Sequence, residues 1–146
     1  MDIGVKFSKE DFDLFKSECL WWINRFGLND WEISFIFGVP EARCDSLACT
    51  GNNYMSMRAT IYFNSTCDSD DMLAMNKEKL IRMCAFHEVF EIVLSPLEHL
   101  ALQRDWDSEA YESERHRILH RVRKAIDEAD RDILREALNI KNRSKS

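Results

Sequence analysis

Apolar positions follow a helical period near the start of the chain. Residues 8–25, "SKEDFDLFKSECLWWINR", carry apolar side chains at helical spacing, namely Phe12, Phe15, Cys19, Trp22 and Ile23. Ser8, three residues before Asp11, resembles a capping box with aspartate in place of the usual glutamate, and Gly27 suits a helix end. We therefore expect a first helix from Ser8 to Arg25.

Two later segments alternate between apolar and polar residues, which is the period of a half-buried strand. The first, "WEISFIFG", begins at Trp31 and is closed by Gly38 and Pro40. The second, "SMRATIYFN", places Met57, Ala59, Ile61 and Phe63 on one face. A weaker strand is expected between them, around residues 43–50, followed by the turn signal "TGNN". Together these strands predict a three-stranded, mainly antiparallel sheet.

The second half of the chain predicts two helices. One runs from Asn76 to about Ser95, where Pro96 is expected to end it. The other runs from about Ser108 to Leu138, with an apolar stripe of Ile118, Leu119, Val122, Ala125, Ile126, Ala129 and Ile133. This order of elements predicts one α+β domain over residues 1–140, followed by a flexible polar tail over residues 141–146.

Composition narrows the classes of function. A formal net charge of −6 argues against sequence-independent binding to nucleic acid, which needs a basic surface. No stretch reaches the length of a transmembrane helix, and the first residues lack the pattern of a signal peptide, so we expect a cytoplasmic protein without a membrane anchor. Five cysteines without tight pairing favour free thiols in a reducing compartment. The oligomeric state stays open.

The expected site lies in "LIRMCAFHEVFEIVL", residues 80–94, an apolar run that contains His87, Glu88 and Glu91. Burying unpaired carboxylates in such a helix is costly, so we expect a metal, a cationic partner or an open cleft to compensate them. His87 and Glu91 are four residues apart and share one face, and Glu88 is offset by roughly 100°. In an HE-x-x-H helix this arrangement holds zinc beside a water-activating glutamate, and zinc also accepts a carboxylate ligand. The alternative is a structural His–Glu pair.

The segments "DWEISF", "MRATIYFN", "HEVFE" and "PLEHLA", followed by an acidic last helix, resemble the small zincin-type metallopeptidases encoded by phages and prophages. The resemblance covers roughly Trp31 to Val122. It implies a zincin-like fold in which His87 is the first metal ligand and Glu88 the general base, with Glu91 in place of the family's second histidine. A carboxylate there weakens the Lewis acidity of the ion. Zinc is the expected metal, and a harder divalent ion such as manganese is the alternative.

The resemblance further implies an acidic third ligand from the last helix. Glu114, one turn before Ile118 on the stripe, matches best, and Glu112 is the second choice. His99, beyond Pro96, is a further candidate for a replacement ligand. Arg115 could instead pair with Glu91 in a salt bridge. The strand "MRATIYFN" is the candidate for a sheet edge that pairs with an extended peptide.

We therefore expect a metal-dependent hydrolase, in first place a zinc-type peptidase that uses a metal-bound water and acts on a protein or peptide. The alternative is a catalytically inactive zincin-like protein that binds a host or viral protein. If a phage encodes the chain, we expect the protein to act in the host cytoplasm under either alternative.

Overall fold

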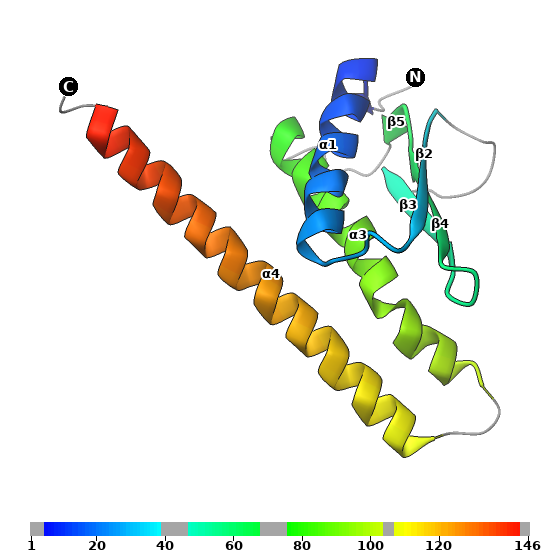
Figure 1. Cartoon of the computed structure of the whole chain (residues 1–146). Helices are drawn as coiled ribbons and strands as arrows, with labels where there is room; N and C mark the ends of the chain where they lie inside the picture. Colours follow the sequence, from blue (N-terminus) through cyan, green and yellow to red (C-terminus); the bar gives the residue numbers. More distant parts are fainter. Residues whose placement is uncertain (1–4, 39–46, 68–75, 104–106, 144–146) are drawn as a thin grey trace.

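Helices and strands are mixed along the chain, whose computed structural model describes residues 5–38, 47–67, 76–103 and 107–143. In chain order the elements are β1 (Val5–Lys6), α1 (Lys9–Arg25), β2 (Glu32–Phe37), β3 (Ala48–Asn53), β4 (Arg58–Phe63), β5 (Thr66–Cys67), α3 (Lys77–Ala101) and α4 (Ser108–Arg143). Figure 1 shows α1 and α3 beside the strands, while α4 extends well beyond both. The α+β class expected from the sequence is confirmed.

The main sheet is mixed, with strand order β2-β4-β3. β2 pairs with β4 in parallel, from Glu32 opposite Arg58 to Phe37 opposite Phe63. β3 pairs with β4 antiparallel as a hairpin, and the short β1 and β5 form a separate antiparallel pair. The expectation of a mainly antiparallel sheet is wrong for the β2–β4 pair. The reason is that the hairpin places β3 on the far side of β4, so β2 and β4 become parallel neighbours although they are not consecutive.

The hairpin turn lies later than the "TGNN" signal predicted, because residues 50–53 of that signal belong to β3. The chain instead reverses over residues 54–57, where the Met57 N–H donates to the Tyr54 carbonyl at 3.2 Å. Met57 has a φ of 52°, in the left-handed region that tight turns require. The start of the predicted weak strand, residues 43–46, lies outside the described residues.

The start of α1 matches the predicted capping box. The Ser8 hydroxyl accepts from the Asp11 N–H at 3.2 Å, and the Asp11 carboxylate accepts from the Ser8 N–H at 2.8 Å. Two amide groups that the helix leaves without partners are thereby satisfied. The helix ends at Arg25 with Phe26 as its C-cap, and the following Gly27 has a φ of 66°, in keeping with the helix end predicted from the sequence.

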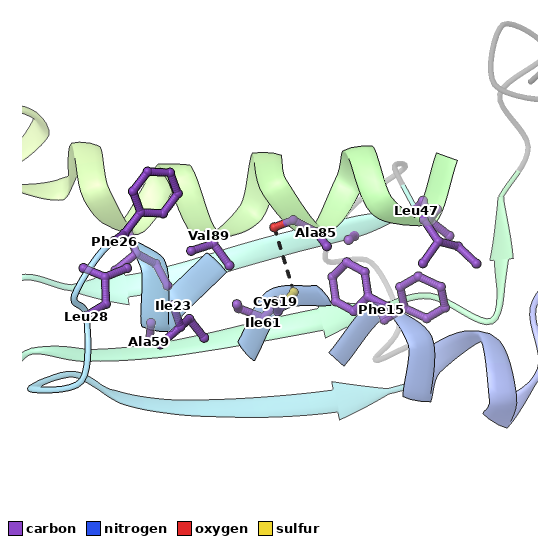
Figure 2. Close-up of a cluster of buried hydrophobic side chains, with 14 of the residues drawn as sticks. Phe15, Cys19, Ile23, Phe26, Leu28, Leu47, Ala59, Ile61, Ala85 and Val89 are labelled. Atoms are coloured by element: carbon purple, nitrogen blue, oxygen red, sulfur yellow. Dashed lines mark hydrogen bonds between the residues drawn. The ribbon is translucent and has the colours of Figure 1, made fainter. Parts of the chain in front are cut away.

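The core lies where α1 and α3 meet the inner face of the sheet (Figure 2). Phe15 of α1 packs on Phe63 of β4 with ring centroids 4.6 Å apart, and both side chains are fully buried. Where α1 passes α3, the two facing residues are small, and the Cys19 thiol donates to the Ala85 carbonyl at 3.9 Å. Small side chains at this point let the two helices approach closely, which fixes α3 against the sheet.

Contrary to the sequence-based expectation, α3 does not stop at Pro96 but continues to Ala101. Proline has no N–H, so the carbonyl of Ile92 loses its usual helical donor. The Ser95 hydroxyl replaces that donor, since its Oγ lies 2.7 Å from the Ile92 oxygen and its side chain is fully buried. A serine directly before the proline therefore allows the helix to pass through it.

We predict that Ser95→Ala lowers the free energy of unfolding by about 1–2 kcal/mol, because the Ile92 carbonyl would remain buried without a donor. In a Pro96→Ala background the same substitution should cost much less, since an alanine at this position would supply the missing N–H. Urea unfolding of the four variants forms a double-mutant cycle that measures this coupling. Equal costs in both backgrounds would contradict the role assigned to Ser95.

α4 packs on the body through only part of its apolar stripe. Ile118 and Ala125 are buried, whereas Leu119 and Ile126 are 57% and 53% exposed. Arg25 of α1 holds the middle of α4 through ion pairs with Glu128, at 3.7 Å, and with Asp132. The helix continues to Arg143, past its predicted end, so residues 141–143 of the predicted tail are helical. Residues 144–146 lie outside the described part.

A membrane-spanning segment was not expected from the sequence. Among the helices that the structure describes, none combines the length and apolarity needed to cross a bilayer.

Candidate functional site

Glu88 is the buried member of the HE-x-x-E segment. It lies in the middle of α3, and only 5% of the residue is exposed. The hydroxyl of Thr50 on β3 donates to its Oε2 at 2.5 Å, and the same hydroxyl lies 3.3 Å from the Glu88 carbonyl. A threonine hydroxyl has one proton, so the nearer carboxylate is its acceptor. This contact joins the site helix to the sheet.

The environment of Glu88 disfavours its charged form. Burial raises the pKa of the Glu88 carboxyl above its ordinary value, the Thr50 hydrogen bond lowers it, the nearby charge of Glu91 raises it again, and His87 lowers it least. Burial dominates, so the net pKa shift is upward. A carboxyl with a raised pKa keeps its proton to higher pH than an ordinary glutamate, which suits a group that exchanges protons during a reaction.

His87 and Glu91 lie on a different side of α3 from Glu88 and face solvent. Their side chains are 68% and 44% exposed, and His87 Nε2 lies 3.1 Å from Glu91 Oε1. The expected cost of burying carboxylates in this helix therefore applies to Glu88 alone. The two donor atoms of the pair are nevertheless held together by their spacing of one helical turn.

A hollow of about 460 Å³ begins at Glu91 and runs between α3 and β3. Its α3 wall consists of Glu91, Leu94, Leu97 and Glu98, and its β3 wall of Thr50 and Asn52. Thr50 thus contributes both to the hollow and to the hydrogen bond with Glu88. The hollow gives a bound molecule access to the region beside the HE-x-x-E segment.

Glu114 is not brought to this hollow. It lines a separate one, of about 340 Å³, together with Ile92 and Pro96 of α3. Its Oε1 pairs with Arg117 at 3.1 Å, and its Oε2 is buried without a hydrogen-bond partner among the described residues. α4 therefore crosses a side of α3 other than the one that carries His87 and Glu91. The structure does not place Glu114 where it would complete a ligand set with them.

The other candidates for the third ligand also have different contacts. Glu112 pairs with Arg115 at 2.8 Å, so this arginine contacts Glu112 in place of the expected Glu91. The ring of His99 lies tilted against the ring of Tyr54, with centroids 5.1 Å apart, and its Nε2 lies 3.1 Å from the Gln103 amide nitrogen. No group of three or more His, Cys, Asp or Glu side chains is close enough to hold an ion within the residues described.

Two of the donors fit a metal ion. Zinc binds histidine nitrogen and carboxylate oxygen at about 2.0–2.2 Å, so two such donors on one tetrahedral ion lie roughly 3.3–3.5 Å apart. The 3.1 Å between His87 Nε2 and Glu91 Oε1 is close to that separation. The described residues thus include two donor atoms whose type and spacing suit such an ion, a spacing that a direct His87–Glu91 hydrogen bond also explains.

Thr50 and Asn52 were not identified from the sequence, where "TGNN" was interpreted as a turn. The signal that could have found them is a pair of polar residues two apart in a strand, which places both on the same face. That signal is weak because the sequence alone does not show which face of β3 is turned toward α3, which depends on how β3 pairs with β4.

Comparison of the chain with models of known protein families, with curated proteins and with solved structures gave no match.

We predict that Thr50→Val lowers the free energy of unfolding by about 1–3 kcal/mol, because it leaves a buried carboxylate without its donor. Thr50→Ser keeps the hydroxyl and is the matched control, with a clearly smaller loss. Urea unfolding at neutral pH measures both variants. If valine and serine cost the same, the hydrogen bond to Glu88 does not contribute as described.

The raised pKa of Glu88 predicts a pH-dependent effect of Glu88→Gln. From about pH 4.5, the ordinary value, the unfolded chain loses this proton while the folded protein retains it. Ionisation of Glu88 therefore lowers wild-type stability as pH rises through this range, whereas glutamine does not ionise. Unfolding measured from pH 4 to 8 should show the variant gaining stability relative to wild type as pH rises. A constant or shrinking difference would contradict the upward pKa shift.

Proposed function

We propose that the protein is a metal-dependent hydrolase with a zincin-like arrangement, acting on peptide bonds. The observation that carries this proposal is the difference in environment between three polar residues of α3. Glu88 is buried with a raised pKa, while His87 and Glu91 present two metal donors to solvent one turn apart. Metal-assisted hydrolysis uses metal-binding side chains beside a proton acceptor, and these three residues supply the acceptor and two of the donors.

The hollow and the sheet edge support a peptide as the substrate. β4, the edge strand expected from the sequence, is the central strand, and that expectation is corrected. In the described sheet β3 is the edge strand on the side of the hollow, and its residues Thr50 and Asn52 line it. An extended peptide that pairs with β3 along residues 50–53 would lie beside α3, with Leu94 and Leu97 available to an apolar side chain.

The residues of the chain have separate tasks in this proposal. His87 Nε2 and Glu91 Oε1 would hold zinc or manganese, which when bound polarises a carbonyl oxygen and makes water acidic. Glu88 accepts the proton released when water attacks and returns it to the departing amine. Thr50 holds Oε2 of Glu88, so Oε1 is the oxygen left for proton transfer.

A second candidate is a catalytically inactive protein of the same arrangement that binds a host or viral protein. The observation in its favour is that the described residues bring together only two donors. Glu91 also adds a negative charge where the resembled family has a neutral histidine. In this case His87 and Glu91 form a surface ion pair and the hollow serves binding alone.

We predict that protein purified without chelator carries about one equivalent of zinc or manganese. His87→Ala and Glu91→Ala should lose the metal, measured by inductively coupled plasma mass spectrometry. The matched control is His116→Ala, because His116 and Glu112 form a second exposed His–Glu pair with the same spacing, on α4. Glu88→Gln should retain the metal and abolish hydrolysis of fluorescein-labelled casein.

The outcomes separate the two candidates. Metal content that His87→Ala does not change would overturn the assigned ligands. Hydrolysis that persists in Glu88→Gln would overturn the role of Glu88. A wild-type protein that holds the metal and cleaves nothing, or holds no metal, supports the inactive binding protein.

A further inference from the structure

α4 carries a second apolar stripe that the body of the protein does not cover. Ile118 and Ala125 face the core and are at most 6% exposed, whereas the next residue in each case, Leu119 and Ile126, is more than half exposed. Successive helical residues differ by about 100° around the axis. α4 is therefore apolar on two adjacent faces, and only one of them packs on α1 and α3.

The second stripe has the spacing of a helix-pairing seam. In the sequence, apolar residues continue the pattern of Leu119 and Ile126 at alternating steps of three and four: Leu119, Val122, Ile126, Ala129 and Ile133. Val122 lies at the border of the two faces and is partly buried against the core. Such 3–4 spacing is the pattern by which one helix packs along another as a coiled coil. α4 is also long enough to offer it, since its 36 residues correspond to about 54 Å. Figure 1 shows its C-terminal half extending away from α1 and α3.

Charges along α4 are divided into two blocks around the middle of this seam. Residues 115–124 contain five arginines and lysines and no acidic residue. Residues 127–136 contain five acidic residues and two arginines. Two of these acids, Glu128 and Asp132, pair with Arg25, which leaves the second block negative. In the basic block, Arg115 and Arg117 pair with Glu112 and Glu114. Arg121, Arg123 and Lys124 keep that block positive. Ile126 lies between the blocks.

We propose that α4 pairs in antiparallel orientation with α4 of a second copy of this chain, with Leu119 and Ile126 in the seam. An antiparallel pair centred near Ile126 places the basic block of each helix beside the acidic block of the other. A parallel pair would place the two basic blocks side by side, which is repulsive. The helix is thus complementary to itself about a two-fold axis, as a symmetric dimer requires. Position 119 would then lie opposite position 133 of the second copy.

The first test is the oligomeric state of the full chain by analytical ultracentrifugation. Wild type should be a dimer, and Leu119→Glu combined with Ile126→Glu should raise the dissociation constant on the order of 100-fold or more, because buried apolar area is replaced by charge. Leu20→Glu is the matched control, since Leu20 is 49% exposed on α1 and lies outside the stripe. It should leave the dimer intact. Circular dichroism checks that each variant is folded.

A second test determines the orientation through disulfide crosslinking under mild oxidation. Chains with Leu119→Cys should crosslink to chains with Ile133→Cys when the two are mixed, and wild type controls for the native cysteines. Leu119→Cys chains that crosslink mainly to each other would overturn the antiparallel arrangement. A wild-type monomer at high micromolar concentration, or a dimer that the double glutamate substitution does not weaken, would overturn the proposal and leave the stripe to a helix of another protein.

Discussion

The packing of α3 between α1 and the sheet is the constraint on which the rest of the structure depends. Cys19 and Ala85 are both fully buried and small enough to let the two helices touch, and Val89 and Ile92 of α3 are buried in the same core. Once α3 is fixed there, position 88 must face β3 and positions 87 and 91 must face outward. The buried carboxyl and the exposed donor pair are therefore consequences of one packing arrangement.

The elements that could be predicted are those determined by neighbours in sequence. The alternation in β2 and β4 and the capping box at Ser8 need no distant contact, and both are present as expected. Strand order could not be predicted in the same way, because the insertion of β4 between β2 and β3 depends on pairing between distant segments. Pro96 shows that even a strong local signal can fail, since a single hydroxyl of Ser95 offsets the lost amide.

The same distinction between local and distant contacts applies to the candidate site. Helical spacing is sufficient to place His87 beside Glu91, but not to identify Thr50, which reaches Glu88 only through the register of β3 on β4. Thr50 was missed, whereas Glu114 was predicted as a ligand and lies elsewhere. Its place on the apolar stripe of α4 correctly predicts that it points to the body, yet a helical wheel does not tell which side of α3 it will meet. Ligand sets that span two helices depend on their crossing, which is a tertiary property.

The charges around Glu88 provide an argument for a cation at the His87–Glu91 pair. Glu91 stands one turn from His87, and its nearby charge adds to the effect of burial in raising the pKa of Glu88. His87 opposes this effect less strongly, and Thr50 offers a neutral donor. A divalent cation bound by Nε2 and Oε1 would offset the charge of Glu91 and favour the ionised, proton-accepting form of Glu88.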